Sequence, residues 1–237
     1  MALLILAAVV VIVTAALLSA AAEPVLAWLC GRWPENDLTR WRRDHLEKRR
    51  AGLTGPGTGP DHPERRRFPA LGDTALAPTR IGNAQAAANQ RIRSAYGLDL
   101  GSTWPVLLVL IPKDMHDRLA SATATVLGRV QQWMLSLGAV VFVPLLWAGH
   151  LRTTHRVLWT AVFLVVWALV TVSAFRRVRA AAYEYFDLVE SVVTAHRKVL
   201  YAELGLAAPT DSDTEPRRGG EISDYLNLDG GTETLSW

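Results

Sequence analysis

Cysteine is nearly absent from this chain. Of its 237 residues only Cys30 is a cysteine, which excludes an internal disulfide and any metal site built from several cysteines. Palmitoylation of a cysteine next to a membrane span is chemically possible. We expect instead a free thiol that is buried or lies at a membrane interface.

Sequence patterns of known catalytic sites are also missing. The chain has no His-Glu-x-x-His and no Gly-x-Ser-x-Gly sequence, which mark zinc proteases and serine hydrolases. The glycines of residues 52–63 are interrupted by prolines and lack the Lys-Ser/Thr pair of a phosphate-binding loop. The six histidines stand at no metal-binding spacing from cysteine or carboxylate residues. We therefore expect no cofactor, no metal and no catalytic residue, and we do not expect an enzyme.

Charged residues are absent from three long apolar runs, residues 2–22, 133–149 and 157–175. An uncharged apolar segment of roughly 17–25 residues is long enough to cross a bilayer as a helix, and a helix satisfies its own backbone hydrogen bonds there. The predicted fold class is an all-α membrane protein with three transmembrane helices. The last two, about 131–150 and 156–175, would form a long antiparallel hairpin. The lack of charge within the spans argues against a proton-coupled transporter.

Positive charge follows the first apolar run and does not precede it. Residues 32–67 contain ten Lys and Arg against six Asp and Glu, and Lys and Arg are retained on the cytoplasmic side of a membrane. This asymmetry favours an uncleaved anchor at residues 2–29 over a secretory signal peptide. It predicts a multi-pass plasma-membrane protein with its N-terminus outside and its C-terminus in the cytoplasm.

A basic juxtamembrane segment and a Gly/Pro-rich linker occupy residues 30–67. A basic run that contains an aromatic residue can bind nucleic acid or anionic lipid. Because membrane topology already accounts for this charge, we expect contact with anionic inner-leaflet lipids and no nucleic acid. The candidate contacts with the membrane surface or a partner are Arg40, Trp41, Arg42, Arg43, Lys48, Arg49 and Arg50.

Residues 68–112 are predicted to form a small cytoplasmic region. Thr79 is suited to begin a helix and Gly97 to end it. The apolar run 106–111 is too short to span a bilayer. Its pattern leaves three possibilities open: a strand, a segment against the inner leaflet, or buried packing.

The same region contains the sequences Thr79-Arg-Ile-Gly-Asn83, Tyr96-Gly-Leu-Asp99 and Trp104-Pro105. Together they resemble a segment of uncharacterised, mostly actinobacterial, membrane proteins, in which it precedes a transmembrane hairpin. The resemblance covers roughly residues 79–205, and leucine is commoner in that group at the position of Ile81. It implies a bacterial inner membrane and the hairpin topology, and it implies no activity. Separately, we take as a candidate interaction segment the residues Arg80, Asn83, Tyr96, Asp99 and Trp104.

Residues 113–204 are predicted to form the helical hairpin. Apolar stripes continue beyond both spans, at 115–130 and 178–199, and indicate two helical extensions that pack as a cytoplasmic stalk. Glu184, Asp187 and Glu190 stand at helical spacing and are predicted to form a solvated face. The acidic tail, residues 205–237, is predicted to be disordered. Its one apolar cluster, 222–229, is either a short docking motif or part of a solubilising tail.

No pattern in the sequence names an activity. We expect a non-enzymatic interaction, scaffold or regulatory subunit that presents a cytoplasmic module to a protein partner or to a second copy of itself. The alternative is an oligomeric pore or membrane-disrupting effector. Three spans are too few to enclose a pore, so further copies of the chain would have to supply the other helices in a symmetric oligomer.

Overall fold

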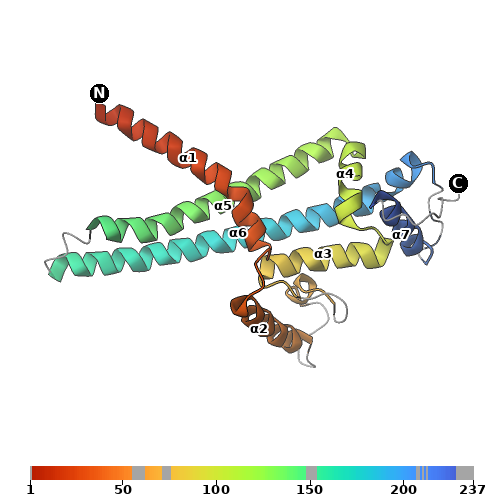
Figure 1. The fold of residues 1–237 in the computed structure, drawn as a ribbon, viewed down its shortest axis with the longest axis horizontal. Helices are drawn as coiled ribbons and strands as arrows, with labels where there is room; N and C mark the ends of the chain where they lie inside the picture. The colour runs from red at the N-terminus through yellow and green to blue at the C-terminus, as the bar shows by residue number, and fades with distance from the viewer. Residues whose placement is uncertain are drawn as a thin grey trace. The chain divides into compact units, whose positions relative to one another are not determined.

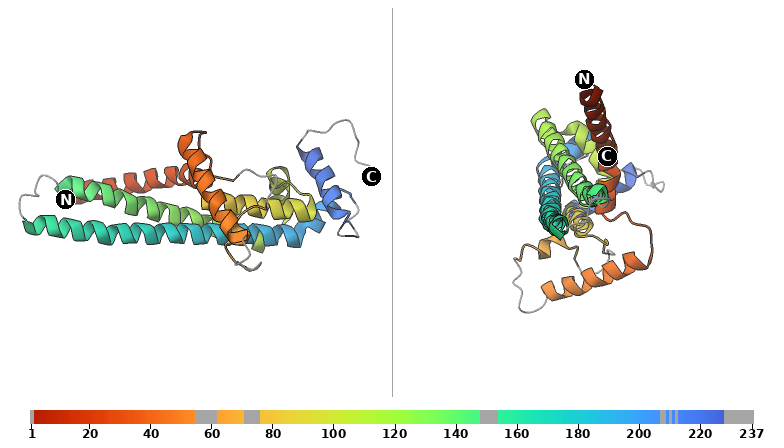
Figure 2. Two further views of the ribbon diagram at one scale, coloured as in Figure 1. Left: turned by 90° about the horizontal axis from the view of Figure 1, so that it is seen from below. Right: turned by 90° about the vertical axis from the view of Figure 1, so that its left-hand side faces the viewer.

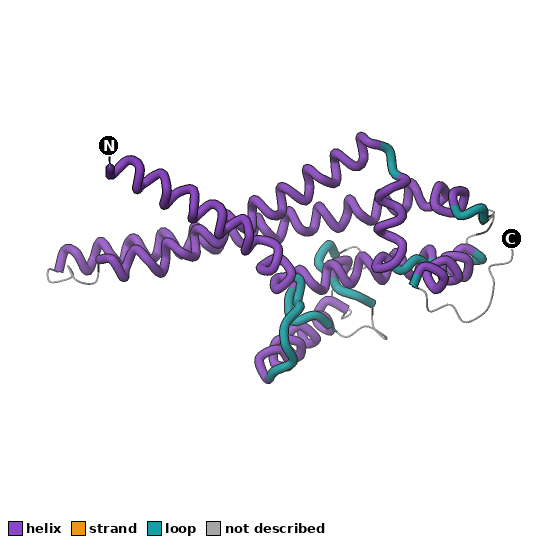
Figure 3. Tube along the Cα trace, turned by 45° about the horizontal axis from the view of Figure 1, so that its top comes forward, coloured by secondary structure: helices purple, strands orange, loops and turns teal. Residues whose placement is uncertain are grey.

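The regular structure is helical throughout the part of the chain that this computed structural model describes. The described residues are 2–54, 62–70, 76–147, 154–206, 209, 211 and 213–227. They contain seven α-helices and one short 3-10 helix, and no strand among them (Figure 3). The predicted all-α class is therefore confirmed.

The chain forms two compact units, each of which is described by itself. Unit 1 comprises Met1–Leu29 and Ala122–Ala182, and unit 2 comprises Cys30–Ser121 and Tyr183–Trp237. Figure 1 labels helices α1 (Ala2–Leu29), α5 (Lys113–Trp147) and α6 (Thr154–Glu203). Helix α1 belongs to unit 1, whereas α5 and α6 contribute turns to both units. The remaining elements of unit 2 are α2 (Asp37–Thr54), η1 (Arg65–Arg67), α3 (Arg80–Tyr96), α4 (Leu100–Leu110) and α7 (Glu215–Leu226).

Among the residues that the structure describes, two helices are long and apolar enough to cross a membrane, where three spans were predicted. The two stretches are Val11–Leu29 in α1 and Leu158–Glu203 in α6. The other predicted span, about 131–150, falls in α5, whose side chains are described only as far as residue 140. The connection at 148–153 lies outside the described residues.

Helices α5 and α6 run side by side in unit 1, as both views of Figure 2 show. The indole nitrogen of Trp167 donates a hydrogen bond to the Ser136 carbonyl oxygen at 2.9 Å. The rings of Trp133 and Phe175 lie 5.5 Å apart between centroids. These contacts join the two helices on one face. Most of the apolar side chains of α6 between Leu158 and Val172 are nevertheless exposed.

The hydrophobic core of unit 2 is built where the end of α6 meets α3, α4 and α7. The apolar stripe on α6 was predicted to pack with the extension of α5 as a stalk. It packs against α3 and α4, which the prediction did not include, because those short helices supply complementary apolar faces. The buried core residues are Ile92, Leu98, Leu107, Ile111, Leu119, Val189, Val192, Val193, Leu200, Tyr201, Leu206 and Ile222.

Helix α3 begins and ends where the sequence predicts. The Thr79 hydroxyl accepts a hydrogen bond from the Gly82 amide at 3.0 Å, as an N-cap does. Gly97 closes the helix in the left-handed conformation, with φ of 71°, which glycine adopts without steric cost. Beyond it, residues 106–111 lie in α4 and its cap, with Leu107 and Ile111 buried. A strand is therefore excluded there. Buried packing accounts for Leu107 and Ile111 but not for Val109, which is 84% exposed.

The acidic tail was predicted to be disordered, and this is wrong for residues 215–226. They form α7, whose Gly219, Ile222 and Ser223 are buried. The physical reason is that Ile222 completes the core of unit 2, and that α7 approaches α3 closely enough for Ser223 Oγ to accept a hydrogen bond from the Asp99 amide at 2.8 Å.

Candidate functional site

The predicted basic run lies on α2, and three of its six basic residues form ion pairs with nearby carboxylates. Arg40 pairs with Asp37 at 2.5 Å, Arg43 with Glu35 at 2.8 Å and Arg49 with Glu64 at 2.8 Å. The Arg49 hydrogen bond lowers the pKa of Glu64. Trp41 is exposed and stacks on His45, while Lys48 is exposed and Arg42 half-buried. Arg50, the last residue of the run, lines the pocket that is described below.

The residues of the candidate interaction segment lie where the elements of unit 2 contact one another. Asn83 is fully buried, and its side-chain amide bonds the backbone of Ala77 and Thr79 at 2.8–2.9 Å. The Tyr96 hydroxyl donates to Thr194 Oγ1 at 3.2 Å. Asp99 precedes α4, and Trp104 packs against the core. Arg80 is half-buried at the start of α3. The structure thus places these residues apart from the pocket.

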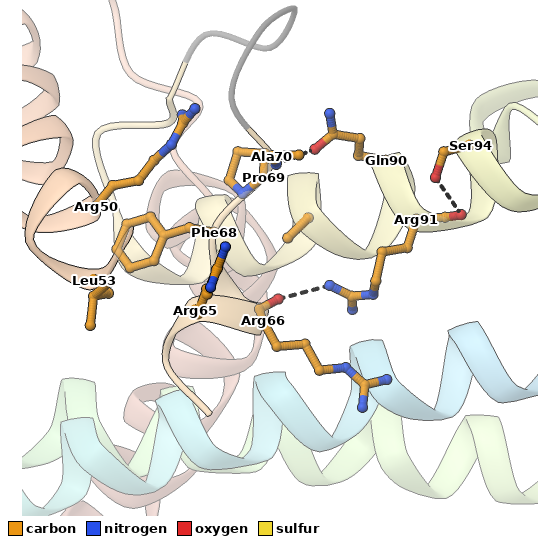
Figure 4. Close-up of a pocket in the computed structure, with 11 residues that line it drawn as sticks. Arg50, Leu53, Arg65, Arg66, Phe68, Pro69, Ala70, Gln90, Arg91 and Ser94 are labelled. Carbon is orange, nitrogen blue, oxygen red and sulfur yellow. Dashed lines mark hydrogen bonds between the residues drawn. The ribbon is translucent and has the colours of Figure 1, made fainter. Parts of the chain in front are cut away.

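A pocket of about 370 Å³ opens between α2, η1 and α3. Figure 4 shows that its walls come from all three elements and from the segment after η1. Four arginines line it and no lining residue is a carboxylate; we call it the arginine pocket. Its lining residues are Arg50, Leu53, Arg65, Arg66, Phe68, Pro69, Ala70, Ala87, Gln90, Arg91 and Ser94.

Glu190 of α6 anchors one wall of the arginine pocket. Its carboxylate accepts from Arg91 Nη2 at 2.7 Å and Nε at 3.0 Å, and from Arg66 Nη2 at 3.4 Å. Arg91 Nη1 also donates to the Arg66 carbonyl oxygen at 2.7 Å (Figure 4). The hydrogen bond from Arg91 is the main cause that lowers the pKa of Glu190. One carboxylate therefore fixes the positions of two of the four arginines.

The predicted solvated face on α6 is corrected by these contacts. Asp187 accepts two hydrogen bonds at 2.7 Å from Arg67, whose guanidinium also lies 4.7 Å from the centre of the Tyr183 ring. Glu190 accepts hydrogen bonds from Arg91 and Arg66. Of the three carboxylates, only that of Glu184 belongs to an exposed residue. Two of the three consecutive arginines of η1, Arg66 and Arg67, are among these partners. Their role was not predicted because η1 and α6 are distant in sequence.

Replacing Glu190 with glutamine is expected to lower the free energy of unfolding at pH 7 by about 2 kcal/mol, because Arg91 and Arg66 lose a charged acceptor. The folded pKa of Glu190 is depressed, so its contribution is present above the unfolded-state pKa of about 4.5 and is lost as pH falls through the folded value. The difference between wild type and Glu190→Gln should therefore shrink as the solution is acidified.

Thermal unfolding of the full chain in detergent between pH 7 and pH 3 measures this difference. Glu184→Gln is the matched control, since Glu184 is an exposed carboxylate on the same helix. A constant difference across the pH range, or an equal loss in both variants, would contradict the assigned role of Glu190.

The chemistry of the site is that of anion recognition. Within the described ranges no group of three or more His, Cys, Asp or Glu residues is placed to hold a metal ion. Guanidinium groups present planar sets of N–H donors that match the oxygens of carboxylates and phosphates. A scan against models of protein families and searches of curated proteins and of solved structures found no match to this chain.

Proposed function

We propose that this chain is an integral protein of a bacterial inner membrane, and that unit 2 is a cytoplasmic, non-enzymatic interaction or regulatory module. The observation that carries the proposal is the exposure of apolar side chains in unit 1. Val11, Trp159 and Leu169 are 67%, 65% and 66% exposed. Lipid would cover exposed apolar side chains of this kind, which monomeric soluble proteins rarely present to water in large patches.

The topology we propose has three spans, with α5 and α6 forming an antiparallel hairpin. Two contacts support it: residue 133 meets 175 and residue 136 meets 167, an order expected of helices that run in opposite directions. Residues 133–147 of α5 contain no charged side chain. The resemblance of residues 79–205 to actinobacterial membrane proteins supports the bacterial inner membrane.

Helix α2 supports contact between unit 2 and an anionic surface. Leu38 and Trp41 are 55% and 59% exposed, and they stand three residues apart, on one face of the helix. His45 extends this face by one turn. Exposed apolar residues flanked by basic ones are typical of helices that lie on anionic lipid. We propose inner-leaflet lipids, and a protein partner or second copy, as what this module contacts.

Membrane fractionation and cysteine labelling test this proposal. We expect the protein to stay in the membrane pellet after alkaline carbonate washing and to dissolve only in detergent. In a Cys30→Ser background, Asn89→Cys and Asp224→Cys, both at exposed positions of unit 2, should react with a membrane-impermeant maleimide only after the cells are permeabilised. Release by carbonate would overturn the membrane assignment, and labelling in intact cells would overturn the orientation.

A further inference from the structure

We propose that the arginine pocket binds an organic phosphate, that is, a phosphate group attached to a small carbon-containing moiety. The first argument is charge. The lining contributes four guanidinium groups and no carboxylate, and the nearby Glu190 pairs with only two of them, Arg91 and Arg66. Among the described residues Arg65 forms no ion pair. Even without Arg50, the guanidinium groups of Arg65, Arg66 and Arg91 outnumber the one carboxylate of Glu190. The pocket therefore carries an excess of positive charge that an anionic ligand would neutralise.

The donors on Arg91 are pre-arranged for such a ligand. A guanidinium group has five N–H bonds. Glu190 and the Arg66 carbonyl oxygen occupy the N–H of Nε and one N–H each of Nη2 and Nη1, which leaves two N–H groups of Arg91 for a ligand. Because Arg91 is already held in place, little side-chain freedom remains to be lost when an anion binds.

The size and the apolar part of the lining indicate more than a bare ion. A pocket of about 370 Å³ falls within the range of small-molecule sites. Leu53, Phe68 and Pro69 supply apolar surface beside the arginines (Figure 4). Gln90 is held in place because its side-chain oxygen Oε1 accepts a hydrogen bond from the Ala70 amide at 2.6 Å. A phosphate would lie toward the arginines and its carbon-containing part toward Leu53 and Phe68.

Two sources offer this chemistry, an anionic phospholipid headgroup and a soluble phosphate ester. The full chain is reconstituted into phosphatidylcholine nanodiscs and titrated with glycerol 3-phosphate, with inorganic phosphate as the carbon-free comparison. In the second arm the nanodiscs contain phosphatidylglycerol, and retained lipid is counted by native mass spectrometry. Binding of glycerol 3-phosphate that is stronger than that of inorganic phosphate assigns a soluble ester, and selective retention of phosphatidylglycerol assigns the headgroup.

Two variants test whether binding occurs in the pocket. Arg65→Gln removes one lining charge and should weaken binding roughly tenfold or more, because the anion loses a hydrogen bond from a charged donor. Ser94→Trp fills the pocket without changing its charge and should abolish binding. Arg93→Gln is the matched control: Arg93 is an exposed arginine of α3 outside the lining, and its loss should change affinity by less than about twofold.

The proposal is overturned if neither glycerol 3-phosphate nor phosphatidylglycerol binds the wild-type chain, or if inorganic phosphate binds as tightly as the ester and no lipid is selected. It is also overturned if Arg93→Gln weakens binding as much as Arg65→Gln does, since binding would then reflect diffuse surface charge. An unchanged affinity in Ser94→Trp would place the ligand elsewhere. These outcomes are independent of the carbonate and labelling results, which concern the membrane spans.

Discussion

Replacing Gly219 with alanine is expected to release α7 from the surface of unit 2. An added Cβ would overlap the carbonyl oxygen of Tyr96 and would lie 3.1 Å from the carbonyl carbon of Gly97. Because both neighbours are backbone atoms, the overlap is relieved only if α7 moves away from α3. That movement exposes Ile222, which is fully buried, and breaks the bond from the Asp99 amide to Ser223. The expected loss of docking free energy is about 3 kcal/mol.

The adjacent residue provides the control. An added Cβ at Gly220 meets no atom within 4 Å, so Gly220→Ala should leave α7 in place or stabilise it by up to about 1 kcal/mol through helix propensity. Two neighbouring Gly→Ala changes in one helix should therefore have effects of opposite sign. The gain in helix propensity is common to both variants. The difference between their docking free energies therefore measures the effect of the close contact between Gly219 and α3.

Amide hydrogen exchange over residues 215–226 of the full chain measures the docking of α7. A loss of about 3 kcal/mol corresponds to roughly a hundredfold faster exchange in Gly219→Ala. Gly220→Ala should exchange as slowly as wild type or more slowly. Equal exchange rates in the two variants would show that α7 does not depend on this contact.

The contacts of α7 also explain why the sequence did not reveal it. Its twelve residues include two glycines and a proline, a composition typical of a disordered segment. The helix is stabilised by residues far away in sequence: Ser223 meets Asp99 across 124 positions, and Glu215 pairs with Arg197. A glycine that permits close backbone approach looks the same in the sequence as a glycine in a linker.

The same limit applies to the candidate site. The residue types of Thr79 and Gly97 predicted the two ends of α3. The apolar periodicity of α5 and α6 predicted two long helices. Both features could be predicted because they depend on residues that are close together in the sequence. Glu190 was predicted to be solvated, since its spacing on α6 is that of an exposed face. Its partners Arg91 and Arg66 lie 99 and 124 positions away. Nothing local to Glu190 indicates them.

Several residues of the Thr79–Asn83 and Tyr96–Asp99 sequences hold elements of unit 2 together. Thr79 caps α3, Asn83 fixes the turn before it, and Gly97 both ends the helix and faces the backbone of Pro216 in α7. The side chains or backbone atoms of these residues contact other residues of unit 2. Structural constraint thus accounts for much of this segment, without reference to a partner.

Gly82 is the second position where a single added methyl group is expected to have a large effect. It lies in the first turn of α3, where an added Cβ would overlap the Cys30 carbonyl oxygen and lie 2.8 Å from the Ala77 Cβ. The obstruction comes from two sides, the backbone that follows α1 and the loop that precedes α3. Either α3 shifts or its N-terminal turn opens, and the buried hydrogen bonds of Asn83 in that turn are disturbed.

We therefore expect Gly82→Ala to lower the free energy of unfolding of unit 2 by about 3 kcal/mol or more, despite a gain of about 1 kcal/mol in helix propensity. Gly52→Ala in α2 is the matched control, because an added Cβ there meets no atom within 4 Å and its effect should be neutral or slightly stabilising. Urea unfolding of the full chain in detergent, followed by tryptophan fluorescence, compares the two. If both variants unfold at the wild-type urea concentration, the first turn of α3 does not lie against the backbone of Cys30, and the packing of unit 2 around α3 must differ from the arrangement described here.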